Sequence, residues 1–143
     1  MNANRPTAGT AQPLSAPEGF QALAAARYVS LETYRKSGAA VRTPVWITAD
    51  AGKLYCWTLT DTGKVRRIRA NAVVRLAKCD AAGALEGDWV AARARILSSP
   101  ASLNAQLERL RAKYGWKYLA YRLISRLRRA ETVAIEFSPG CPR

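Results

Sequence analysis

The pattern of apolar and polar positions predicts six short strands. Alternation begins at Tyr28 and continues to a turn at Ser37-Gly38, which defines the first strand. The other predicted strands span Ala40–Ala49, Lys53–Leu59, Ala72–Cys79, roughly Ala84–Leu97 and Thr132–Phe137. Most are joined by tight turns, such as Asp50-Ala-Gly52 after the second strand. This arrangement favours a mainly β (α+β) fold, a six-stranded antiparallel barrel with peripheral helices, over a parallel βαβ fold.

Helical spacing occurs in three parts of the chain. A short helix is predicted from Pro17 to about Arg27, and a short basic helix begins near Asp61 or Thr62, either of which can cap it. Two basic amphipathic helices follow Ser99-Pro100 and are separated at Gly115. Residues 1–15 are rich in small residues and proline, so we expect a disordered tail there. Residues 16–143 are long enough to form one domain with its own core.

Pro44 interrupts the second predicted strand. A proline has no amide hydrogen to donate to a ladder, so it marks an edge, a bulge or a place where the sheet opens to a ligand. From the residues alone, an ordinary edge strand is the favoured explanation of Pro44, and Trp46 and Trp57 are expected to be core aromatic residues.

The start of the basic helix has the features of an anion-binding site. A helix N-terminus presents unpaired amide groups and the positive end of the helix dipole, and Gly63 allows close approach. At about 100° per residue, Lys64 and Arg67 flank one edge of the buried face, so together they could hold one phosphate. A solvated basic helix that merely follows a strand is the alternative. The glycine spacing does not match a Walker loop.

The net charge of +13 comes from two stretches of the chain. Residues 63–78 hold six Lys or Arg and no acid, and residues 101–129 hold eight against Glu108. Two local positive surfaces predict a polyanionic partner, which could be a phosphorylated cofactor, a nucleic acid or an anionic membrane. No nucleic-acid-binding motif is present, so a nucleic acid is the least favoured of the three.

Other compositional features exclude several kinds of chemistry. The chain contains no histidine, which excludes Ser–His and Cys–His nucleophilic pairs and HExxH metal sites. Its three cysteines are far apart and form no CxxC pair, so we expect neither a disulfide framework nor a metal site. An enzyme of this composition would take its chemistry from a cofactor. We find no signal-peptide pattern and expect a cytoplasmic protein.

The order of the motifs resembles the pyridoxamine 5′-phosphate oxidase-like split β-barrel superfamily. Within it, the chain is most similar to the branch dependent on coenzyme F420, a deazaflavin, whose relatives include FMN-binding proteins. The resemblance spans about residues 17–138. It is carried by six segments, namely 28–38, 42–46, 54–58, 63–71, 74–79 and 91–95.

The resemblance implies a homodimer with the cofactor at its interface and a small-molecule substrate. The second and third predicted strands, around Thr43–Ile47 and Trp57–Thr58, would lie along the cofactor ring, and Thr62–Arg67 would take the phosphate. The implied cofactor-binding residues are Thr43, Pro44, Val45, Trp46, Thr58, Thr62, Lys64 and Arg67. No catalytic residue is assigned. The superfamily's founding oxidase uses histidine at its substrate phosphate, so oxidation of pyridoxamine phosphate is not expected here.

The implied activity is hydride transfer between reduced coenzyme F420 and a small organic substrate. Arg122, Arg126 and Arg129 could follow the poly-glutamate tail of that coenzyme, but a solvated helix face is the favoured explanation of their spacing. FMN is the alternative cofactor. A non-enzymatic polyanion-binding module, with the C-terminal basic helices on an anionic membrane or a nucleic acid, is the alternative function.

Overall fold

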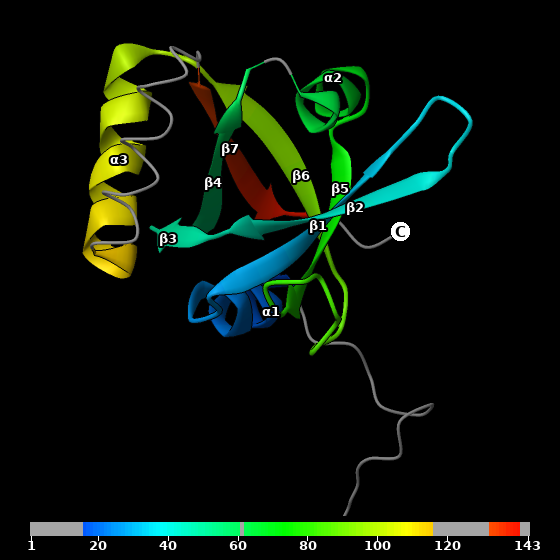
Figure 1. Ribbon diagram of the computed structural model, residues 1–143, viewed down its shortest axis with the longest axis horizontal. Coiled ribbons are helices and arrows are strands. Elements are labelled where there is room, and N and C mark those ends of the chain that lie inside the picture. Colours follow the sequence, from blue (N-terminus) through cyan, green and yellow to red (C-terminus); the bar gives the residue numbers. More distant parts are fainter. Residues whose placement is uncertain (1–15, 61, 116–131, 141–143) are drawn as a thin grey trace, which may run out of the picture.

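The structure is a computed structural model, and it describes residues 16–60, 62–115 and 132–140. In this part of the chain there are three helices and seven strands (Figure 1). They are α1 (Ala16–Ala24), β1 (Tyr28–Tyr34), β2 (Ala40–Trp46), β3 (Thr48–Asp50), β4 (Lys53–Leu59), α2 (Gly63–Ala70), β5 (Val73–Cys79), β6 (Val90–Leu97), α3 (Pro100–Tyr114) and β7 (Thr132–Pro139). The predicted tail 1–15, Asp61 and the second basic C-terminal helix lie outside the described residues.

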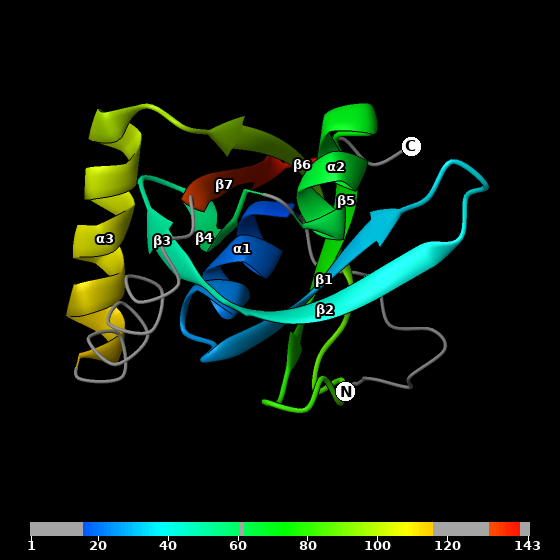
Figure 2. The ribbon, with the colours of Figure 1, turned by 45° about the horizontal axis from the view of Figure 1, so that its top comes forward.

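All seven strands belong to one antiparallel sheet, in the order β2-β1-β5-β6-β7-β4-β3. The sheet curls, so that β2 at one end of this order contacts β4 near the other end (Figures 1 and 2). Along the chain, only Ile47 separates β2 from β3. Among the described strands, no hydrogen-bonded ladder joins β2 to β4. The expected mainly β antiparallel split barrel is therefore confirmed, whereas the expected number of six strands was wrong by one.

The additional strand arises because the predicted strand Ala40–Ala49 breaks at Ile47. The amide nitrogen of Ile47 donates to the hydroxyl of Tyr114 (3.0 Å), and its carbonyl oxygen accepts from Nζ of Lys113 (2.6 Å). Two side chains of α3 thus take the backbone groups that a continuous strand would pair within a sheet. The local sequence pattern cannot show this, because the partners lie 66 and 67 residues further along the chain.

The predicted strand Ala84–Leu97 is shortened at its beginning, since β6 starts only at Val90. The preceding loop turns back on β5. Oδ1 of Asp80 accepts from the amides of Ala82 and Ala84, both at 2.9 Å, and the amide of Glu86 donates to the carbonyl of Lys78. These turn contacts hold the loop against the sheet instead of extending the strand.

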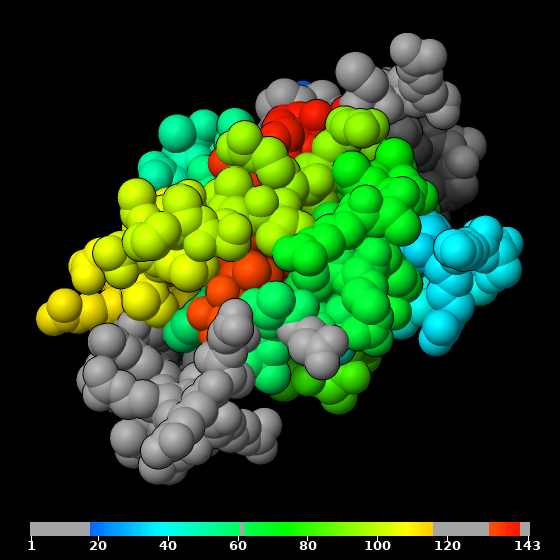
Figure 3. All heavy atoms as spheres, turned by 90° about the horizontal axis from the view of Figure 1, so that it is seen from above, coloured from blue at the N-terminus to red at the C-terminus, as the bar shows by residue number. Residues whose placement is uncertain are grey.

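The core fills the inside of the curl. Its largest buried side chains come from several strands and include Leu31, Leu54, Leu76, Ile135 and Phe137. Helix α1 lies within the curl and adds Phe20 and Leu23 (Figure 2). Helix α3 packs on β3, β4 and β7, whereas α2 packs on β1 and β6. Figure 3 shows α2, β6 and α3 side by side on one face of the molecule.

Candidate functional site

A cavity of about 240 Å³ occupies the split between β2 and β4. Its lining comes from β1, β2, β4, α2 and α3, and consists of Tyr28, Pro44, Val45, Trp46, Trp57, Thr58, Lys64 and Leu110. Strand β2 is an edge strand of the sheet, so the missing amide hydrogen of Pro44 leaves no gap in the middle of the sheet. The cavity combines three aromatic rings, which offer flat apolar surfaces, with one ammonium group.

The structure brings five of the eight predicted cofactor-binding residues to this cavity, namely Pro44, Val45, Trp46, Thr58 and Lys64. Thr43 does not line it, and pairs with Leu31 of β1. Thr62 is the N-cap of α2, and Arg67 lies in its last turn, with the guanidinium reaching back to Gly63.

The sequence analysis did not identify Tyr28 or Leu110 as part of the site. Leu110 belonged to the regular apolar spacing of α3, which predicts burial and gives no indication of a cavity.

The aromatic wall is held in place by α3. The ring of Trp46 is stacked on that of Tyr114, with centroids 4.5 Å apart and an interplanar angle of 12°. The Tyr114 hydroxyl donates to the carbonyl of Arg27 (2.7 Å) and accepts from the amide of Ile47. Burial raises the pKa of Tyr114 to about 12, so the hydroxyl keeps its proton and this donor. Trp46 therefore presents its other face from a fixed support.

Lys113, the neighbour of Tyr114, anchors the same end of α3. Its Nζ donates to three backbone carbonyls, those of Ala24 (3.0 Å), Ala26 (2.6 Å) and Ile47 (2.6 Å). These bonds tie α3 to the end of α1 and to the junction of β2 and β3. They also satisfy carbonyl groups that no strand pairs.

The cationic side of the cavity is the first turn of α2. Thr62 is the N-cap residue, but its side chain makes no capping bond, and its Oγ1 instead donates to the carbonyl of Leu59 (3.2 Å). Burial, with a further contribution from Arg67, lowers the pKa of Lys64. A half-buried ammonium beside a second cation is a destabilising arrangement that an anion would relieve. The amides of this turn and Lys64 together favour such an anion.

Arg67 lies over the same turn, although it does not reach the cavity. Its Nε donates to Oγ1 of Thr33 (2.7 Å), and its Nη1 lies where a side chain on Gly63 would begin, 2.6 Å from a Cβ placed there. Burial and the nearby Arg35 and Arg66 lower the pKa of Arg67. The absence of a side chain at Gly63 thus makes room for a guanidinium against the helix N-terminus.

Nucleophilic or metal chemistry has little support in the structure. Cys56 is completely buried, and burial raises the pKa of its thiol to about 12, so it is not a reactive thiolate. Burial also raises the pKa of Cys79. Within the described ranges, no three His, Cys, Asp or Glu residues are arranged to hold a metal ion. No helix in these ranges is long and apolar enough to cross a membrane.

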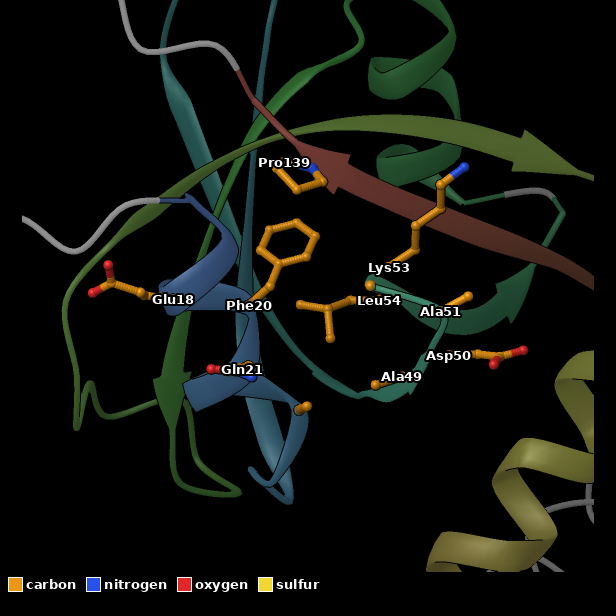
Figure 4. A pocket seen from close by; sticks show the side chains of 11 residues that line it. Glu18, Phe20, Gln21, Ala49, Asp50, Ala51, Lys53, Leu54 and Pro139 are labelled. Carbon is orange, nitrogen blue, oxygen red and sulfur yellow. The ribbon is translucent and has the colours of Figure 1, made fainter.

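A larger cavity, of about 680 Å³, lies between α1 and the β3–β4 hairpin. Phe20, Leu54 and Pro139 form its apolar floor, and the carboxylates of Glu18 and Asp50 at its edge point away from them (Figure 4). Asp50 is paired with Arg109 (3.6 Å). Its cation, Lys53, is paired with Glu136 (3.5 Å), and Phe20 is the one aromatic residue of its lining, so the smaller cavity at β2 and β4 is the better candidate despite its size.

Comparison with known proteins gives the family. The family model described as pyridoxamine 5′-phosphate oxidase matches residues 9–139, and the chain therefore belongs to that family. No curated protein matches the sequence.

Solved structures share the fold at low identity. A conserved hypothetical protein from Mycobacterium tuberculosis is 18% identical with a TM-score of 0.64, covering 87% of this chain and 79% of its own. An F420 reductase is 21% identical, with a TM-score of 0.56 and coverage of 87% and 96%. An FMN-binding protein from Nostoc punctiforme is 17% identical, with a TM-score of 0.57 and coverage of 87% and 76%.

Proposed function

We propose that the protein is an oxidoreductase that uses a deazaflavin or flavin cofactor, with coenzyme F420 as the first candidate. The observation that carries this proposal is the cavity at the β2–β4 split, which joins aromatic walls to Lys64 at the start of α2. When bound, such a cofactor supplies a ring that exchanges hydride with a small organic substrate. The absence of histidine agrees with a protein that binds and orients a cofactor rather than performing acid–base chemistry itself.

The residues of the cavity fit both parts of such a cofactor. Trp46, Trp57 and Tyr28 would flank the flat ring, while Pro44 and Val45 place the backbone of the edge strand beside it. Lys64 and the uncapped first turn of α2 would bind the phosphate. Leu110 covers the cavity from α3 and keeps water from the ring.

A homodimer would complete this site. The cavity in one chain, about 240 Å³, is smaller than the roughly 300–1,000 Å³ usual for small-molecule sites. We therefore propose that a second copy of the chain covers the cavity and encloses the cofactor.

FMN is the alternative cofactor, since an FMN-binding protein shares the fold. A single phosphate would use Lys64 and leave the C-terminal arginines without a role. Arg122, Arg126 and Arg129, proposed to follow the tail of coenzyme F420, lie outside the described residues.

The polyanion-binding alternative is weaker for the described part of the basic stretch. Of the three cations on α3, Arg109 is placed over the Tyr55 ring at 3.7 Å, and Lys113 is bonded to three carbonyls. Only Arg111 remains as an exposed cation without such a role in the helix.

Parallel titration with coenzyme F420 and FMN tests the proposal. Quenching of tryptophan fluorescence reports binding, because Trp46 and Trp57 line the cavity. Tighter binding of coenzyme F420 supports the deazaflavin assignment. Tighter binding of FMN indicates that FMN is the cofactor and that the activity is ordinary flavin chemistry. Failure of both to bind at micromolar concentrations contradicts the proposed function.

A further inference from the structure

A row of charged side chains crosses one face of the sheet. Glu32 of β1 is directly opposite Arg42 of β2 on one side and Arg75 of β5 on the other, so all three point to the same face. The Glu32 side chain is 1% exposed, whereas those of Arg42 and Arg75 are 52% and 41% exposed. The row thus has a buried anion at its centre and two accessible cations at its ends.

The buried carboxylate fixes the orientation of both guanidinium groups. Oε2 of Glu32 accepts from Nε of Arg42 (2.9 Å), and Oε1 accepts from Nε of Arg75 (2.6 Å). The hydroxyl of Tyr34 also donates to Oε1, at 2.6 Å. Both arginine bonds to Glu32 use Nε, so Glu32 does not occupy the terminal nitrogens, which recognise planar oxyanions, and Arg75 also bonds to the Tyr34 side chain.

Trp89 holds the two cations together. The guanidinium carbon of Arg42 is 4.8 Å from the centroid of the Trp89 ring, and that of Arg75 is 4.9 Å from it. Two cations sharing one aromatic ring repel each other, and Glu32 neutralises only one of their charges. A net positive charge remains on a preorganised, partly exposed surface.

We propose that Arg42 and Arg75 form a second anion-binding site, which takes the carboxylate or phosphate group of a small molecule. A purely structural ion pair needs only one arginine for the carboxylate. The second arginine, the shared Trp89 ring and the partial exposure of both guanidinium side chains instead provide a fork for an incoming oxyanion.

The site lies on the same face as part of the candidate cofactor cavity. Pro44 is two residues beyond Arg42 along β2, so about 7 Å separates the two positions. The oxyanion can therefore be a free ion or the charged end of a molecule that also occupies the cavity. The site itself does not depend on the proposed cofactor.

Fluorescence of Trp89 tests this inference in the full chain. Phosphate and acetate are titrated into the millimolar range at constant ionic strength, with chloride as the reference salt. The difference between the native chain and Trp89→Phe isolates the Trp89 signal. We expect a saturable change with the oxyanions, and about tenfold weaker binding in Arg42→Gln, because one charge-assisted hydrogen bond is lost.

Controls separate this site from general charge effects and from misfolding. Arg111→Gln, on the exposed side of α3, removes the same charge and should leave the titration unchanged. Arg42→Lys retains the charge but loses the planar fork, so its binding should also weaken, while far-UV circular dichroism reports folding. An equal response to chloride, or equal binding by Arg42→Gln and the native chain, overturns the proposal.

Saturating coenzyme F420 distinguishes the two sources of the anion, because its tail carries carboxylates besides the phosphate assigned to Lys64. If the oxyanion is free, phosphate gives the same Trp89 response in the presence of coenzyme F420. If it is the charged end of a molecule in the cavity, coenzyme F420 itself changes the Trp89 signal and blocks phosphate. Either result supports the site, whereas the absence of any Trp89 response to every oxyanion contradicts it and leaves the cofactor proposal untouched.

Discussion

Glu32 should stabilise the fold strongly at neutral pH and lose this effect in acid. Burial alone would raise the pKa of Glu32, but hydrogen bonds from Arg75, Tyr34 and Arg42 lower it from 4.5 to about 2. Each pKa unit corresponds to about 1.4 kcal/mol, so the shift corresponds to about 3 kcal/mol. Because Arg42 and Arg75 are half exposed, solvent screening reduces the expected contribution to about 2–3 kcal/mol.

The sign of the pH dependence follows from the depressed pKa. The folded protein holds Glu32 ionised where the unfolded chain has begun to bind a proton, so the stabilisation is complete above about pH 4.5. It is lost as the pH falls from there towards about 2. The variant Glu32→Gln removes the ionisation, so it should be about 2–3 kcal/mol less stable than the native chain at pH 7.

Urea unfolding of both proteins between pH 7 and pH 3 measures this difference. The gap in the free energy of unfolding should narrow as the pH falls below 4.5. Glu108→Gln, which removes an exposed carboxylate of α3, is the control and should change stability by less than about 0.5 kcal/mol. An equal stability of Glu32→Gln and the native chain at pH 7, or a gap independent of pH, would refute the reasoning.

Three other substitutions test the contacts that shape the candidate site. Tyr114→Phe leaves the buried amide of Ile47 without its acceptor and should lower the free energy of unfolding by about 1–3 kcal/mol; an unchanged melting curve would contradict this. Gly63→Ala displaces the mobile end of Arg67, and the gain in helix propensity offsets the lost bond to Thr33, so urea unfolding should show a change within about 1 kcal/mol. A loss above about 2 kcal/mol would show that Arg67 cannot move. Ala51 has a φ of 51° in the β3–β4 turn, so Ala51→Asn should raise thermal stability by roughly 0.5–1 kcal/mol, and destabilisation would argue against that turn.

Local patterns predicted the strands well because alternation depends on neighbouring residues. The break at Ile47 could not be predicted, since its cause is Lys113 and Tyr114 at the far end of α3. For the same reason no local pattern indicated that Leu110 would face the cavity. Elements were therefore more predictable than the contacts that end them.

The part of the candidate site that comes from short, continuous segments of the chain could be predicted. Pro44, Val45 and Trp46 are consecutive, and the resemblance to a known family placed them beside Thr58 and Lys64. Helical geometry alone put Arg67 on the same edge as Lys64. The hydrogen bond from Arg67 to Thr33 depends on the position of β1. The periodicity of α2 gives no information about that position.

The central claim, that Lys64 and the start of α2 hold the phosphate of a flavin-type cofactor, is tested most directly by comparing ligands with and without that phosphate. Binding of FMN and riboflavin, or of coenzyme F420 and its phosphate-free deazaflavin nucleoside, is measured for the native chain, Lys64→Gln and Arg69→Gln. Lys64→Gln should weaken the phosphate-bearing ligand about 10- to 100-fold and leave the phosphate-free ligand unchanged, because only a charge-assisted bond to phosphate is lost. Arg69→Gln, on the exposed side of the same helix, should change neither. Equal loss for both ligands, or no loss for either, would contradict the account.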